Sequence, residues 1–193
     1  MPNWAEGTLK IRGSRKNLLK FCKERLGERT GDGEKAIIWE IRHYGDNDDE
    51  LVAKYYNFSE LCIWLKESRR MFIDMGNEVP YNWDVGGKDI SEDPKHSKFE
   101  YETKFWLHKM PGEDDWLVVF PFQAAWGVME DYFEQMSKEY GLIFRVYTVE
   151  QGMGFFSEIL VKDGETTELG GGPAGNSGYG EFIWECPFPF LGG

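Results

Sequence analysis

Apolar and polar residues alternate over several short stretches of the chain, and this alternation predicts β-strands. Leu9 and Ile11 alternate with charged residues, which indicates a strand with one buried face over residues 8–12. Other stretches carry similar alternation or compact apolar runs rich in β-branched and aromatic residues. They predict further strands at residues 36–44, 99–108, 116–120, 142–149 and 155–161. A turn at Pro111-Gly112 would join the strands at 99–108 and 116–120 into a hairpin.

Three other stretches repeat their apolar residues at helical spacing. The first predicted helix covers residues 15–27 and follows Ser14, which suits an N-cap. The second begins at Phe58 and stops at Gly76. The third, over residues 126–140, has the most regular apolar stripe and ends at a glycine. Its stripe consists of Trp126, Met129, Phe133, Met136 and Tyr140.

Glycine, proline and clustered acids predict where regular structure stops. The acids at residues 46–50 indicate a solvated loop, and two prolines and a glycine pair make residues 77–98 an irregular insertion. Residues 1–164 then form a single domain. A glycine-rich linker is predicted for residues 165–180, followed by an apolar C-terminal segment at 181–193.

The order of these elements predicts the fold class. A strand, a helix and a strand precede the central insertion, and a hairpin, a helix and two strands follow it. This order fits an α+β domain with a ferredoxin-like antiparallel sheet and helices packed on one face. The central insertion and the C-terminal extension would be additions to that core.

Composition and charge narrow the function classes. The 193 residues are 41% hydrophobic and 16% aromatic, which is enough to build a sizeable core. The net charge is −12, but residues 1–30 hold eight basic groups against three acids. Because a negative surface repels phosphate, direct nucleic-acid binding is disfavoured outside the first helix. The acidic excess is explained either by solubility alone or by attraction to a basic partner.

Cysteines and the apolar runs bear on location. The three cysteines, Cys22, Cys62 and Cys186, form no Cys-x-x-Cys pair, which favours a reducing compartment. The first residues lack the apolar core of a secretory signal, and no run is long enough to span a bilayer. We therefore expect a cytoplasmic protein without a membrane segment.

No pattern in the chain predicts catalysis. His43, His96 and His108 stand in separate segments without metal-ligand spacing, so neither a metal nor another cofactor is expected. Nothing in the sequence brings a cysteine close to a histidine as nucleophile and base. The glycines at 170–175 lack the Gly-Lys-Ser/Thr ending of a phosphate-binding loop. The interpretation is a non-enzymatic protein.

Two segments carry a family resemblance. The chain opens Met1-Pro2-Asn3-Trp4, followed by a strand and Gly13, and later Ala125-Trp126 precedes a helix, a strand and Glu150-Gln151-Gly152. In these motifs the chain resembles the YubB ferredoxin-like family of phage- and plasmid-encoded proteins, although Ala5 stands where the family usually has cysteine. The resemblance implies a ferredoxin-like fold without an iron–sulfur cluster, a phage or mobile-element setting in a bacterial host, and no established enzymatic activity.

The leading hypothesis is a phage or mobile-element binding protein that engages a host protein, such as a nucleic-acid-binding defence complex. Carboxylates arrayed like phosphates would occlude a basic groove, and association would weaken as salt rises. Exposed aromatic residues would serve as apolar anchors. The candidates for contact with the partner are Asp46, Asp48, Asp49, Glu50, Asp114, Asp115, Glu130, Asp131 and Glu134, with Trp184 and Phe188 as anchors.

Two alternatives remain open. The first is a nucleic-acid-binding module, because ferredoxin-like sheets can present aromatic residues for base stacking beside a basic helix. Its basic residues would be Lys16, Lys20, Lys23, Arg25 and Arg29. The second is a small ligand-binding protein or enzyme with a pocket near the insertion, which would gather one of the three histidines with a carboxylate. Oligomeric state is not predicted.

Overall fold

A computed structural model describes residues 4–27, 37–43, 48–56, 62–68, 70–74, 83–89, 99–111, 114–150 and 152–173. Helices α1 (Arg15–Arg25) and α2 (Glu130–Tyr140) have eleven residues each. All other regular elements in these ranges are strands. They are β1 (Trp4–Gly13), β2 (Leu26–Gly27), β3 (Ile38–His43), β4 (Asp48–Tyr56), β5 (Cys62–Leu65), β6 (Met71–Asp74), β7 (Trp83–Asp89), β8 (Phe99–Lys109), β9 (Trp116–Ala125), β10 (Ile143–Glu150), β11 (Phe155–Lys162) and β12 (Glu165–Pro173).

The predicted fold class is wrong. The described chain is mainly antiparallel β-sheet, with twelve strands joined in one sheet and two short helices, rather than a ferredoxin-like α+β domain. The prediction failed because several strands lie in segments that looked helical or irregular. Some of their partners are distant in the sequence, as in the pairing of β4 with β8 and of β6 with β9, and the local pattern does not contain that information.

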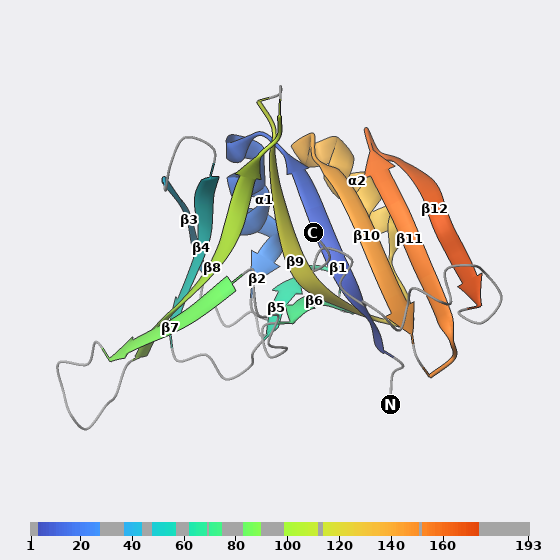
Figure 1. The fold of residues 1–193 in the computed structure, drawn as a ribbon, viewed down its shortest axis with the longest axis horizontal. Helices are drawn as coiled ribbons and strands as arrows, with labels where there is room; N and C mark the ends of the chain where they lie inside the picture. Colours follow the sequence, from blue (N-terminus) through green and yellow to red (C-terminus); the bar gives the residue numbers. More distant parts are fainter. Residues whose placement is uncertain are drawn as a thin grey trace.

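The sheet forks at β9 (Figure 1). From one edge its order is β12, β11, β10, β1 and β9, and every pairing is antiparallel. On the far side of β9, Trp116–Val118 pair with β8, whereas Phe122–Ala124 pair with β6. Strand β8 also pairs with β7 and with β4, and β4 pairs with β3, whereas β6 continues to β5 and β2. Pro121 lies between the two paired stretches, where the N–H that proline lacks is least needed.

The core lies between the sheet and the two helices. Leu9 and Ile11 of β1 point to the helix side with Phe120 and Phe144 of the neighbouring strands, and all four are fully buried. Phe133 of α2 approaches Phe144 with ring centroids 5.3 Å apart. Full burial of each such side chain stabilises the fold by about 1.5–3 kcal/mol. These contacts position both helices on the sheet.

The predicted second helix is wrong. Its residues 62–65 and 71–74 form β5 and β6, joined by a turn. Ile63 and Ile73 are buried in the core, while Trp64 and Phe72 pack on each other with ring centroids 4.8 Å apart. A short apolar run is compatible with the residue spacing of a helix and with that of a strand. Here the pairing of β6 with β9 stabilises the strand.

Three further expectations need correction. Asp48–Glu50 begin β4 instead of belonging to a solvated loop, and residues 83–89 of the predicted irregular insertion form β7. Residues 165–173 form β12 instead of a linker and pair with β11. Strands β4 and β7 both pair with β8, and β12 forms a hairpin with β11, the strand directly before it. Residues 174–180 of the linker and the apolar segment at 181–193 lie outside the described residues.

The first and third predicted helices are confirmed, although their ends differ. The first runs from Arg15 to Arg25, and the next two residues form β2. The third begins at Glu130, so Trp126 precedes it. The strands predicted at 8–12, 99–108, 116–120 and 155–161 lie within longer strands. No helix among the described residues has the length and apolar character needed to cross a membrane.

Candidate partner-binding surface

Trp126, in the connection between β9 and α2, is the most exposed aromatic side chain among those whose burial the structure describes. The residue is 64% exposed, and its backbone φ is 67°, in the left-handed region. Gly127 follows with a φ of 107°. The two residues therefore form a sharp turn that directs a large apolar side chain into solvent.

Both ends of this turn are fixed. Before it, the buried Ala125 donates its backbone N–H to the carbonyl oxygen of Arg70 at 2.8 Å. After it, Val128 and Met129 pack against the core. The indole of Trp126 is thus carried by a short connection between two anchored positions.

The backbone conformation of Trp126 is unfavourable by itself. A non-glycine residue in the left-handed region costs about 1–2 kcal/mol, because its β-carbon crowds the following carbonyl oxygen. Glycine would adopt the same conformation without this cost. Strain of this kind gathers at functional positions, where the surrounding structure holds the residue in place. An exposed tryptophan gains too little from packing to offset it.

Two exposed acids follow Trp126 directly. Glu130 and Asp131 occupy the first turn of α2, where carboxylates interact favourably with the helix dipole. The N-cap residue Met129 makes no side-chain capping bond. Glu134, one turn further on, is half-buried and accepts a hydrogen bond from Thr166 Oγ1 at 2.8 Å. Glu130 and Asp131 are therefore available to a partner, whereas Glu134 joins α2 to β12.

A second exposed apolar residue, Met153, lies in the turn between β10 and β11. It is 69% exposed. The buried Glu150 carboxylate accepts hydrogen bonds from the backbone N–H groups of Met153 and of Gly152, the latter at 2.9 Å. This carboxylate fixes the turn, so Met153 is presented on a defined backbone.

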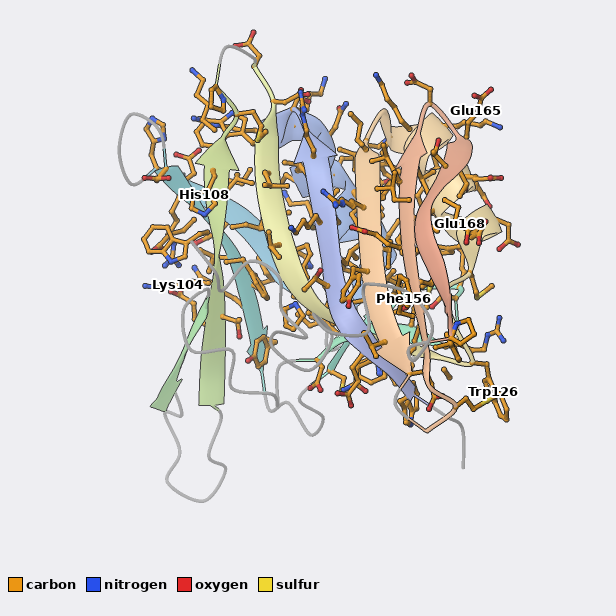
Figure 2. All side chains as sticks on the ribbon, turned by 45° about the vertical axis from the view of Figure 1, so that its right-hand side comes forward. Lys104, His108, Trp126, Phe156, Glu165 and Glu168 are labelled. Carbon is orange, nitrogen blue, oxygen red and sulfur yellow. The ribbon has the colours of Figure 1, made fainter. Side chains whose placement is uncertain are left out.

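Trp126 and Met153 lie at the same end of the sheet. The register pairs Ala125 with Trp4 at the start of β1, and Val149 of β10 pairs with Glu6. Figure 2 shows Trp126 at the end of the sheet where β10 turns into β11. We call these two residues, with Glu130 and Asp131, the Trp126 surface.

The other predicted acids lie elsewhere. Asp48 is exposed on β4 and Asp114 is exposed at the turn before β9, at the opposite end of that strand from Trp126. A ten-residue strand spans about 30 Å. The remaining predicted acids of this end contact basic side chains: Asp49 contacts Arg15 and the imidazole of His43, Glu50 pairs with Lys104, and Asp115 pairs with Arg12. The predicted acids therefore do not form one continuous face, and Asp46, Trp184 and Phe188 lie outside the described residues.

The predicted basic helix is partly as expected. Lys16, Lys20 and Lys23 are exposed on α1, and Arg29 lies outside the described residues. The aromatic residues Trp64 and Phe72, however, alternate with core residues that face the helices, so they lie on the other side of the sheet. The alternative of base stacking beside the basic helix requires both on one surface.

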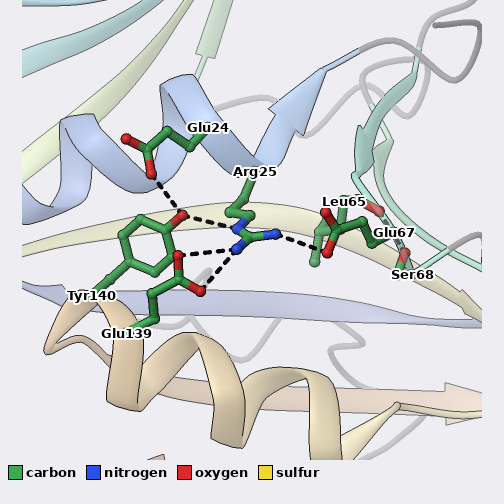
Figure 3. Close-up of polar contacts among 7 residues, drawn as sticks. All are labelled: Glu24, Arg25, Leu65, Glu67, Ser68, Glu139 and Tyr140. Carbon is green, nitrogen blue, oxygen red and sulfur yellow. Dashed lines mark hydrogen bonds and ion pairs between the residues drawn. The ribbon is translucent and has the colours of Figure 1, made fainter.

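Arg25 serves a structural role instead (Figure 3). It donates hydrogen bonds to Tyr140 Oη at 2.8 Å, to Glu67 at 2.8 Å and to Glu139 at 3.0 and 2.8 Å. Tyr140 in turn donates to Glu24 at 2.9 Å. Burial opposes the charge of Arg25, but the bonds with Tyr140 and Glu139 raise its pKa overall. The arginine thus clamps the ends of both helices to the turn before β6.

These contacts also shift the partners of Arg25. The hydrogen bond from Arg25 holds the pKa of Glu139 below its ordinary value. Burial raises the pKa of Tyr140 to about 12, against the opposing effect of Arg25. All of these groups keep their usual charge near neutral pH, so the cluster is a fixed electrostatic joint.

Two histidines that the sequence left apart from any acid are paired in the structure. His43 Nδ1 lies 2.5 Å from Asp49, and His108 Nδ1 lies 3.1 Å from Asp48. No group of three or more histidine, cysteine or acidic side chains is placed to hold a metal ion within the described ranges. Burial raises the pKa of the Cys22 thiol, which makes it a poor nucleophile. His96 and Cys186 lie outside those ranges.

Sequence reasoning missed the Trp126 surface because the indole fits the apolar stripe of the third helix. The signal that distinguishes it is Gly127, which directly follows the tryptophan and suits a turn rather than a helix start. No family model, curated protein or solved structure matches the chain. The resemblance to the YubB ferredoxin-like family therefore rests on the sequence motifs alone.

Proposed function

We propose that this chain is a binding protein whose Trp126 surface engages a partner protein with a basic contact region. The observation that carries the proposal is the exposed indole of Trp126, held in a strained backbone conformation shortly before two exposed acids of α2. The family resemblance suggests a host protein as the partner, such as a nucleic-acid-binding defence complex that would be occluded.

The indole would supply most of the binding energy. Tryptophan is enriched at the centres of protein interfaces, where a few residues dominate affinity. Burying the roughly 150–250 Å² of an aromatic side chain at about 25 cal/mol per Å² contributes on the order of 3–6 kcal/mol. Because Trp126 is only 64% exposed, its contribution lies at the low end of this range. Met153 would extend the apolar contact.

The acids would govern specificity and rate. Glu130 and Asp131 lie in the first turn of α2, four and five residues after Trp126, and the chain as a whole carries a charge of −12. Such a charge attracts a basic partner over a Debye length of about 8–10 Å and raises the association rate. Salt screens this attraction, so association should slow as ionic strength rises while the apolar contact persists.

The test is capture of partners from a bacterial lysate by the tagged full chain, at low and high salt and with and without nuclease. The Trp126→Gly variant should lose the captured partner, since it removes the indole and keeps the turn. Leu169→Ala removes an exposed apolar side chain from β12 and serves as the matched control. Glu130→Gln with Asp131→Asn should weaken capture mainly at low salt.

Two results would count against this function. Capture that is the same for Trp126→Gly and Leu169→Ala would show that the indole is not the anchor. Capture that nuclease removes and that Lys20→Glu abolishes would point to nucleic acid bound by the exposed lysines of α1 instead.

A further inference from the structure

A second constellation lies at the other end of the sheet, where β3 and β4 pair beside the start of α1. Register places His43 opposite Asp49, and Arg15 is the first residue of α1. The nearby strand β8 pairs with the start of β9 in this region, whereas Trp126 follows the end of β9. This site is therefore separate from the Trp126 surface.

Asp49 is held from two sides. Its carboxylate is fully buried, with Oδ1 2.5 Å from His43 Nδ1 and Oδ2 2.9 Å from Arg15 Nε. The guanidinium of Arg15 lies 3.9 Å above the ring of the buried Trp116. Trp116, Arg15, Asp49 and His43 form a chain of contacts in which only the last member is widely open to solvent.

The contact with Asp49 fixes the tautomer and the orientation of the His43 imidazole. A carboxylate is acceptor-only, so Nδ1 donates its hydrogen to Asp49 and the neutral ring carries its free electron pair on Nε2. The side chain of His43 is 69% exposed, which leaves Nε2 accessible from outside. A buried acid that orients an exposed imidazole is the geometry that general bases and nucleophilic histidines use.

The chain contains its own comparison. His108 contacts Asp48 through Nδ1 at 3.1 Å, and both side chains are 53% exposed. Because Asp48 and Asp49 are neighbours on β4, their side chains point to opposite faces of the sheet. His108 is thus an imidazole beside an exposed acid, whereas His43 is an imidazole oriented by a buried one.

We propose that His43 is a nucleophilic centre for neutral, activated acyl compounds, with Asp49 and Arg15 as positioning residues. In the first step Nε2 forms a bond to the acyl carbon, the ester C–O bond breaks and the alcohol or phenol leaves as its anion. Water then cleaves the acyl-imidazolium: its oxygen joins the acyl carbon, the C–N bond breaks and the carboxylic acid is released. The remaining water proton passes to the departed anion, and the neutral imidazole returns with Nδ1–H still bonded to Asp49. An anionic substrate is disfavoured because the acidic chain repels it.

The probe is 4-nitrophenyl acetate, whose hydrolysis by the full chain is followed through release of 4-nitrophenolate. His43→Gln should lower the protein-dependent rate about tenfold, less than the 10²–10⁴-fold typical of an enclosed general base, since the pair is open to solvent. His108→Gln should leave most of the rate intact. Mass spectrometry after an acid quench should detect an acetyl group on His43.

Two further readouts test the roles. The difference in hydrolysis rate between the unsubstituted chain and His43→Gln should increase with pH, because only the neutral imidazole attacks. Asp49→Asn should reduce the rate and alter this pH profile, with circular dichroism reporting that the fold persists. If Asp49→Asn does not fold, Arg15→Lys tests the same anchor through a milder change.

Equal rate losses in His43→Gln and His108→Gln, or no loss in either, would overturn the proposal and leave His43 as a counter-ion of Asp49. Trp126→Gly should not change ester hydrolysis, so failure of this site and failure of partner binding are distinguishable.

Discussion

The two ends of α2 use left-handed backbone in opposite ways. At the C-terminal end Gly141 adopts a φ of 61°, its N–H bonds to Ser137, and Glu139 and Tyr140 are tied to Arg25. At the N-terminal end the left-handed residue is Trp126, and the N-cap Met129 makes no side-chain capping bond. One end satisfies its groups in the ordinary way, and the other retains strain and exposed apolar surface.

This difference shows at which end of α2 the chain is less stable than it could be. Glycine costs little at a helix C-terminus, and an arginine that joins three segments there strengthens the fold. A tryptophan in the same conformation weakens the fold, and the packing of its mostly exposed side chain is too little to offset this cost. Selection for stability alone would place glycine at both positions. The N-terminal end is therefore the end on which binding should depend.

The largest expected effect comes from the middle of α2, on which both ends rely. Phe133 is fully buried and contacts the rings of Phe122, Tyr132 and Phe144. Phe133→Ala should lower the free energy of unfolding by about 3–5 kcal/mol, through lost burial and the cavity left behind. Urea denaturation measures the loss. Phe133→Leu should cost less than about 1.5 kcal/mol, and equal losses would show that the site collapses around the smaller residue.

The next effect concerns the clamp at the C-terminal end. Arg25→Ala should lower the free energy of unfolding by about 1.5–3 kcal/mol, because hydrogen bonds to charged partners are lost from a site where the arginine is only 15% exposed. Arg42→Ala is the matched control. Arg42 of β3 binds Glu102 of β8, and its side chain is 34% exposed. Because the pair is more open to solvent, Arg42→Ala should lower the free energy of unfolding by at most about 1 kcal/mol. Similar losses in urea denaturation would contradict the structural role of Arg25.

Gly141→Ala should destabilise the same end by about 1 kcal/mol. The added β-carbon would lie 3.5 Å from Asn17 Nδ2, an ordinary contact, so the loss should come from the backbone angle rather than from a clash. Thermal or urea unfolding measures it. A neutral result would show that the C-cap relaxes.

Trp126→Gly should act in the opposite direction and stabilise the chain by about 0.5–1 kcal/mol, since relief of the left-handed strain exceeds the entropy that glycine adds to the unfolded state. Trp126→Ala removes the same indole but keeps a β-carbon, so it should give no gain. Urea denaturation of both variants separates strain from loss of the side chain. If Trp126→Gly and Trp126→Ala have the same free energy of unfolding, the backbone at Trp126 is not strained.

The smallest effect is a dependence on pH. The pKa of Glu139 is lowered from 4.5 by its hydrogen bond with Arg25, so this contact stabilises the folded state fully above about pH 4.5 and is lost as pH falls through the folded value. Stability measured from neutral to acid pH should therefore decline less steeply in Arg25→Ala. An unchanged slope would mean that Glu139 does not contribute.

The sequence pattern correctly predicted the elements whose buried residues recur at regular spacing. Leu9 and Ile11 revealed β1, and Phe133, Met136 and Tyr140 revealed α2, because each set lies on one buried face. Patterning failed at Trp64 and Phe72, since a short apolar run suits a helix or a strand until its partner is known. The partner of β6 is β9, some fifty residues later, and only the folded chain supplies it.

The candidate sites were harder to predict than the fold. Glu130 and Asp131 were predicted as contacts with the partner, but Trp126 was assigned to the apolar stripe of the helix, because spacing alone does not report a backbone angle. The pairing of His43 with Asp49 depends on the register of β3 and β4, and Arg15 joins them from a separate helix. No local sequence signal contains that coincidence.

The position of β1 has a consequence for synthesis. Both of its neighbours come much later in the chain: Trp4 pairs with Ala125, and Arg12 pairs with Ile143. At about 5–20 residues per second, translation leaves this strand without either partner for several seconds. During that interval β1 has two unpaired edges, which leaves it open to pairing with other chains before its own partners are made.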